Sequence, residues 1–83
     1  MSLKRSRYDI VSEILELSNT PVGVNITKIV YSVNLNFKNA QEIISELIFK
    51  GMLEVVDGGG RVRYRTTKKG LEFLSKYENL VSF

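Results

Sequence analysis

The stretch from Asn34 to Gly51 reads NLNFKNAQEIISELIFKG, and it predicts a tight turn followed by one amphipathic helix. Asn36 suits the position before the helix because its side-chain oxygen can accept a hydrogen bond from a free amide of the first turn. Gly51 suits the end because glycine adopts the left-handed conformation at little cost. Apolar residues recur between them at spacings of three and four, and they form one stripe: Ala40, Ile43, Ile44, Leu47 and Ile48. The stretch therefore predicts a helix that packs one face on a core and turns the other outward.

The outward face of this helix is polar, and it carries Lys38, Asn39, Glu42, Ser45 and Glu46. A cation and amide groups near the start of a helix suit contacts to phosphates and to base edges. For any one of these residues taken alone, a solvated helix face is an equally good interpretation.

The residues before this stretch predict two shorter helices. In chain order we expect a basic, fraying arm over 1–6, a helix over 7–18, a loop over 19–23, a very short strand over 24–26 and a helix over 28–33. Thr27 is the expected N-cap of that second helix. About three residues separate the second helix from the third, and Ala40 allows the two to approach closely. This arrangement is typical of a helix-turn-helix.

The residues after Gly51 change to the period of a β-hairpin. Strands are expected over 52–56 and 61–66, joined by the turn at 57–60. The second strand alternates strictly, with Val62 and Tyr64 on one face and three arginines on the other: Arg61, Arg63 and Arg65. Leu53 and Val55 are expected on the buried face. Glu54 falls opposite Arg63 in one hairpin register and opposite Arg65 in the other.

A last helix is expected over 68–80, capped by Thr67 or Thr66. It carries more apolar surface than so small a core needs, which favours self-association. The candidate dimerisation residues are Leu71, Leu74, Tyr77, Leu80 and Val81. The alternative is that this helix covers the first helix of the same chain.

The positive charge of the chain is concentrated in two clusters that contain no acid. The net charge is +3, with Lys4, Arg5 and Arg7 in residues 1–8 and Arg61, Arg63, Arg65, Lys68 and Lys69 in residues 58–69. Two acid-free basic clusters on a slightly acidic body are typical of a surface that binds a polyanion. Basic termini that only aid solubility are the alternative.

Composition argues against several other classes of protein. A chain of 83 residues has room for one core, and it contains neither histidine nor cysteine. The commonest general base, metal ligand and thiol nucleophile are thus missing, so we expect no enzyme, no metal and no cofactor. The sequence shows no apolar run long enough to span a membrane, so we expect a cytoplasmic protein.

Five stretches carry a resemblance to a known family. They are RSRYDIV (5–11), TKIVY (27–31), LNFKNA (35–40), LIFKGML (47–53) and YRTTKKGLEFL (64–74). In these stretches the chain resembles the small archaeal winged helix-turn-helix proteins of the transcriptional-regulator type. The resemblance implies an α+β, mainly α fold of three helices, a two-stranded wing and a C-terminal helix. It divides the chain into the arm (1–6), a three-helix core (7–51), the wing (52–66) and a dimerisation helix (67–83).

The resemblance and the charge pattern together predict a homodimer that binds double-stranded DNA and regulates transcription. The third helix is expected in the major groove, and the wing on the backbone or in the minor groove. The candidate DNA-binding residues are Arg5, Arg7, Lys28, Asn36, Lys38, Asn39, Gln41, Arg61, Arg63 and Arg65. Glu42 departs from the pattern because it would repel phosphate unless it accepts a hydrogen bond from cytosine. The alternative function is a protein-interaction module, which Phe49 favours because it falls on the outward side of the third helix.

Overall fold

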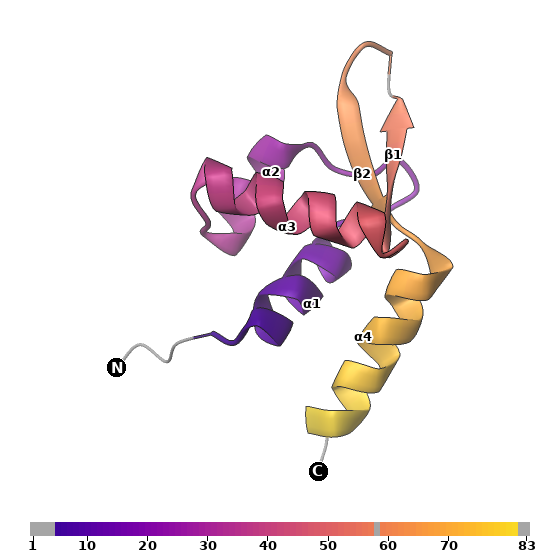
Figure 1. Cartoon of the computed structure of the whole chain (residues 1–83). Helices are drawn as coiled ribbons and strands as arrows, with labels where there is room; N and C mark the ends of the chain where they lie inside the picture. The colour runs from indigo at the N-terminus through magenta and orange to yellow at the C-terminus, as the bar shows by residue number, and fades with distance from the viewer. Residues whose placement is uncertain (1–4, 58, 82–83) are drawn as a thin grey trace.

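Four helices and one hairpin make up the fold of the computed structural model, which describes residues 5–57 and 59–81 and the side chains of these as far as Tyr77. In chain order they are α1 (Arg7–Leu17), α2 (Ile26–Val33), α3 (Phe37–Phe49), β1 (Leu53–Asp57), β2 (Val62–Thr66) and α4 (Lys68–Val81) (Figure 1). The expected class, mainly α with a two-stranded antiparallel sheet, is confirmed.

The predicted helix of the opening stretch is α3, and its ends lie where the sequence places them. The Asn36 side chain accepts a hydrogen bond from the Asn39 amide at 2.7 Å. Gly51 follows the helix with a φ of +78°, in the left-handed region. Buried along the helix are Ala40, Ile43, Ile44 and Leu47. The periodicity of apolar residues therefore identified the inner face correctly.

The first two helices begin at caps that the sequence analysis did not identify. Asn25 caps α2 and accepts from the Lys28 amide at 2.9 Å, so Thr27 lies inside the helix and its expected capping role is wrong. Ser6 forms a capping box with Asp9 at the start of α1. The expected fraying is therefore wrong for Ser6, while residues 1–4 lie outside the described residues. In both helices the side chain of the residue just before the first helical residue accepts a hydrogen bond from a free amide of the first turn.

A single hydrophobic core holds the helices together and reaches one end of the hairpin. Its buried members are Val11, Ile14, Leu15, Ile29, Val33, Ile43, Ile44, Leu47, Leu53 and Leu74. The turn from α2 into α3 starts at Asn34, whose φ of 58° and ψ of 55° are tolerated by asparagine better than by most residues. This turn fixes how α3 crosses the core.

The hairpin has the second of the two expected registers, with Glu54 opposite Arg65. The expected burial of Val55 is wrong, because 55% of its surface is exposed whereas Leu53 is buried. Only the Leu53 end of the hairpin covers the core, and the rest projects beyond the helices (Figure 1). The strand expected over 24–26 is reduced to one bridge, in which Val24 and Tyr64 exchange backbone hydrogen bonds.

Helix α4 follows the hairpin directly; its first turn lies close to the backbone at Met52, and the helix then packs along α1. The Thr67 hydroxyl accepts from the Gly70 amide at 3.2 Å, so Thr67 is the cap. A Cβ on Gly70 would lie 2.5 Å from the Met52 carbonyl oxygen, which explains a glycine inside this helix. Tyr8 and Phe73 stack with ring centroids 6.0 Å apart. The described part of α4 therefore covers α1, as the alternative interpretation expected.

Candidate nucleic-acid interface

One row of exposed side chains runs along α3 on the side opposite its core stripe. Helical spacing places Lys38, Glu42, Ser45 and Phe49 in this row, and all four are exposed. The Phe49 side chain is 90% exposed. We call these four residues the outer row of α3.

The charged side chains on the flank of α3 that faces α1 form ion pairs with one another. Arg7 donates to Glu46, and Lys50 Nζ lies 3.0 Å from Glu46 Oε1. The hydrogen bond from Lys50, followed by the charge of Arg7, holds the pKa of Glu46 below its usual range. Asn39 lies two turns before Glu46 on this same flank. Arg7 is therefore engaged within the chain, and Asn39 lies beside the outer row rather than in it.

The opposite flank of α3 faces the hairpin across an open groove of about 530 Å³. Its lining residues are Ile26, Gln41, Glu42, Ile44, Ser45, Ile48 and Tyr64. By register, Val55 and Val62 lie on the same face of the sheet as Tyr64, and both are 55% exposed. The face of the hairpin that looks toward α3 is therefore mainly apolar.

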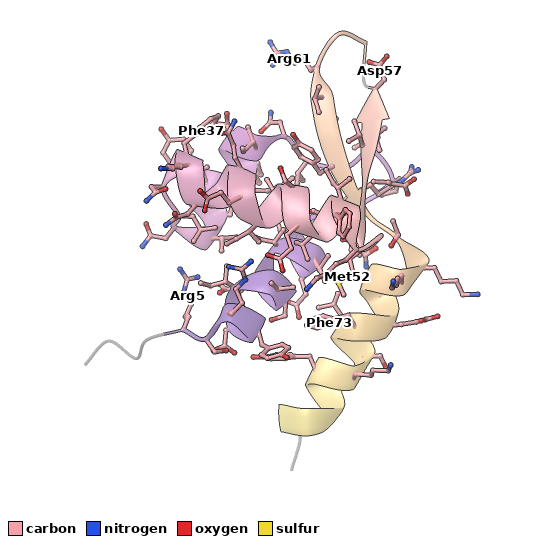
Figure 2. All side chains as sticks on the ribbon, viewed as in Figure 1. Arg5, Phe37, Met52, Asp57, Arg61 and Phe73 are labelled. Carbon is pink, nitrogen blue, oxygen red and sulfur yellow. The ribbon has the colours of Figure 1, made fainter. Side chains whose placement is uncertain are left out.

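The three arginines of the hairpin lie in different environments. Arg63 lines a separate hollow with Pro21, on the sheet face opposite Tyr64. Arg65 donates from Nε to Glu54 Oε2 at 3.1 Å and from Nη1 to the Pro21 carbonyl at 3.0 Å. Arg61 is exposed at the hairpin tip, and Figure 2 shows it directed toward the side on which α2 and α3 lie. The structure thus brings Arg61 to the side of α3 and turns Arg63 and Arg65 to the other side of the hairpin.

The remaining candidate residues lie in the segments before α3 and in its first turn. Arg5 donates to Glu13 at 2.7 Å and to the Val33 carbonyl at 2.6 Å, beside the turn that precedes α3. Lys28 is exposed in the first turn of α2. Asn36 is exposed, but its side-chain oxygen is used by the cap of α3. Among the described residues, Lys38 has no ion pair, so it is the available cation at the start of α3.

The candidate dimerisation residues divide between the core and the surface. Leu74 is 6% exposed and belongs to the core, while Leu71 is 41% exposed. The Tyr77 hydroxyl donates to Asp9, and this hydrogen bond is the largest cause that lowers the pKa of Asp9, followed by those from Ser6. The same contact raises the pKa of Tyr77. The side chains of Leu80 and Val81 lie outside the described residues.

Sequence reasoning missed two features of this surface. Glu46 was placed on the outward face, whereas it is held by Arg7 and Lys50. The outer row was not separated from its flanks, although a rotation of 100° per residue already groups Lys38 with Ser45 and Asn39 with Glu46. Lys50 lies four residues after Glu46, where helical spacing indicates a contact, whereas Arg7 lies on a different helix, and no local pattern predicts that pair.

Two helices joined by a tight turn, with an antiparallel hairpin beside the second, define a winged helix-turn-helix domain. A family model described as winged helix-turn-helix matches residues 4–83, and the chain belongs to that family. Comparison with curated proteins finds no match. No helix in the described part of the chain is long and apolar enough to cross a membrane.

Solved structures share this fold. Sso10a-2, described as a DNA-binding protein from Sulfolobus solfataricus, is 26% identical with a TM-score of 0.79, over 94% of this chain and 80% of that one. A MarR-family transcriptional regulator from Rhodococcus sp. RHA1 is 16% identical with a TM-score of 0.78, over 87% of this chain and 53% of that one. The oxidised form of MarR from E. coli is 15% identical with a TM-score of 0.74, over 90% of this chain and 52% of that one. The chain spans about half the length of the two MarR proteins, which show the fold alone.

Proposed function

We propose that this protein binds double-stranded DNA by inserting the first turns of α3, with Lys38, Glu42 and Ser45 of the outer row, into the major groove. The observation that carries the proposal is the placement of Lys38 at the start of α3 and Arg61 at the hairpin tip, with Arg61 directed toward the side of α3. A helix that enters the major groove is positioned by cations that contact the neighbouring phosphates, and Lys38 and Arg61 carry the charge for such contacts. The likeness to Sso10a-2, a DNA-binding protein by its description, supports the same function.

In this proposal the cations supply sequence-independent affinity, and contacts to base edges supply the preference for a DNA sequence. Lys38 and Arg61 release counterions from the duplex, and Lys28, which is exposed on α2, adds positive potential. Lys38 also reaches guanine acceptors, and the amides of Gln41 and Asn39 suit adenine. Four arginines have a smaller part, because Arg5, Arg7 and Arg65 are engaged within the chain and Arg63 lies on the far side of the hairpin.

We further propose that two copies associate through α4, using apolar residues of this helix that do not pack on α1. Leu71 is exposed on this helix, whereas Leu74 and Tyr77 serve the contact with α1. A twofold dimer presents two α3 helices to half-sites about one helical turn apart, and the second contact gains from high effective concentration. Such a dimer regulates transcription in the cytoplasm by occupying its site, with no chemical step.

Fluorescence anisotropy on a mixed-sequence duplex at 50 and 200 mM salt tests the proposal. The expected result is binding that weakens steeply with salt, since each neutralised phosphate contributes a slope of about 0.9. Lys38→Ala should reduce both affinity and slope, while Lys76→Ala, on the exposed side of α4, is the matched lysine control. Binding at neither salt concentration would refute the function, and sedimentation at the same concentrations reports the dimer.

A second candidate function, a protein-interaction module, is favoured by one specific observation. Phe49 is 90% exposed at the end of the outer row, and the hairpin also exposes Val55 and Val62. A helix that reads a groove has little use for so exposed a phenyl ring, whereas protein interfaces are enriched in aromatic residues. A failure to bind any duplex at low salt, with the fold intact by circular dichroism, would favour this second function.

A further inference from the structure

The carboxylate of Glu42 stands in the middle of the surface that the proposed function assigns to DNA. It lies four residues after Lys38 and three before Ser45 in the outer row, and it lines the groove with Gln41. A carboxylate at this position repels phosphate, so it weakens binding unless it meets a hydrogen-bond donor on the duplex. Its position therefore calls for a function of its own.

Glu46, the acid on the neighbouring flank of α3, is neutralised within the chain, and Glu42 is not. Glu46 is held by Arg7 and Lys50. In the part of the chain that the structure describes, no cation lies within 4.0 Å of Glu42, although Lys38 is only one turn away. Glu42 is exposed and available to a ligand.

Base edges in the major groove offer one good partner for an unprotonated carboxylate. Cytosine presents its N4 amino donor without an acceptor beside it, whereas guanine and thymine present acceptors that repel a carboxylate. Adenine has an amino donor as well, but its N7 acceptor lies next to it and suits an amide side chain better. Cytosine is thus the one base that a carboxylate in this groove meets favourably.

We propose that Glu42 is a specificity-determining residue that selects cytosine at one position of each half-site. This inference rests on the proposed insertion of α3 into the major groove. Lys38 lies four residues earlier, which is about 6 Å along the helix axis, or roughly two base-pair steps. Lys38 prefers the O6 and N7 acceptors of guanine, so the selected cytosine lies within about two base pairs of a guanine. The same carboxylate penalises the other bases, and this repulsion contributes to selectivity.

Selection of bound duplexes from a random pool tests the inference with three proteins: wild type, Glu42→Gln and Glu42→Ala. Wild type should enrich cytosine at one position of each half-site, by about 5- to 150-fold over the other bases. Glu42→Gln should move the preference at that position to adenine, because glutamine pairs with N6 and N7 of adenine. Glu42→Ala should lose the preference at that position and keep it elsewhere.

A matched control separates base reading from net charge. Glu72→Gln removes the same charge from an exposed position on α4, and it should leave every base preference unchanged. If Glu42→Gln and Glu42→Ala raise affinity equally on all duplexes, Glu42 only repels phosphate and the inference is overturned. The failure of the proposed function is a different result, namely that wild type binds no duplex even at low salt.

Discussion

Arg61 directly precedes β2 and Arg65 lies near the other end of this strand; both carry the same charge, yet the structure predicts that their alanine variants differ. Arg61 is exposed at the hairpin tip, while Arg65 is held by Glu54 and by the Pro21 carbonyl. A side chain with two partners inside the chain must give them up before it contacts phosphate. We therefore expect Arg61→Ala to weaken DNA binding and Arg65→Ala to weaken mainly the fold.

The size of the first effect follows from counterion release. Loss of one phosphate contact lowers the slope of log affinity against log salt by about 0.9 per copy of the chain. Salt rises fourfold between 50 and 200 mM. Over this range the factor by which affinity falls should therefore be about 3.5 times smaller for the variant than for wild type, per copy of the chain. Arg65→Ala should keep the wild-type slope and lower the free energy of unfolding by about 1 kcal/mol, since its hydrogen bonds lie near the surface.

Anisotropy titrations at four salt concentrations measure the slope, and urea unfolding followed by circular dichroism measures stability. Both variants lose one positive charge, so each is the control for the other. An equal flattening of the slope in both variants would show that only net charge matters, and it would refute the assignment of the two arginines to different sides of the hairpin. An unchanged slope in Arg61→Ala would remove the hairpin tip from the interface.

Three further predictions concern the fold and the second candidate function. Gly70→Ala should lower the free energy of unfolding by about 1–2 kcal/mol in urea, because the clash with the Met52 carbonyl outweighs the better helix propensity of alanine. The pKa of Asp9 lies below its ordinary 3.8, so the stability that it contributes is present above that value and is lost as the pH falls through the native pKa. Acid unfolding of Asp9→Asn should therefore depend less steeply on pH below about 4 than that of wild type, and an identical slope would contradict a stabilising contact with Tyr77. Phe49→Ser should change the free energy of unfolding by less than about 0.5 kcal/mol and leave DNA affinity intact. If the second candidate function holds, the same variant should no longer retain the partner protein in a pull-down.

The sequence predicted α3 well because everything that defines it is local. The cap at Asn36, the apolar stripe and the glycine at 51 all act within one or two turns. The caps of α1 and α2 were less certain because several short polar residues compete near each start. Asn25 caps α2 in place of the expected Thr27, and Ser6 caps α1, for which no cap was predicted; only the backbone conformation decides between such neighbours.

The hairpin was harder to predict because its two faces meet different parts of the chain. Alternation placed Arg63 and Arg65 on one face correctly, but it carries no information about which face looks toward α3. The bridge between Val24 and Tyr64 fixes the orientation, and it joins residues 40 positions apart. A Cβ on Gly23 would lie 2.7 Å from the Tyr64 carbonyl oxygen, so the glycine before the bridge allows this close approach. The meaning of that glycine is visible only once its partner strand is known.

The pairing of charges within the chain has a consequence for the proposed function. Arg7 and Lys50 pair with Glu46 on the flank of α3, and Arg65 pairs with Glu54 on the other side of the hairpin, so these cations are not available to phosphate. A surface with few available cations gains little sequence-independent affinity, because that affinity scales with the number of neutralised phosphates. Glu42 lowers it further wherever the base is wrong. Under the proposed function, these features lower non-specific binding more than specific binding, and the ratio between the two decides occupancy in a genome. One copy alone would bind weakly, so the twofold dimer is needed to bring a selective contact to a useful affinity.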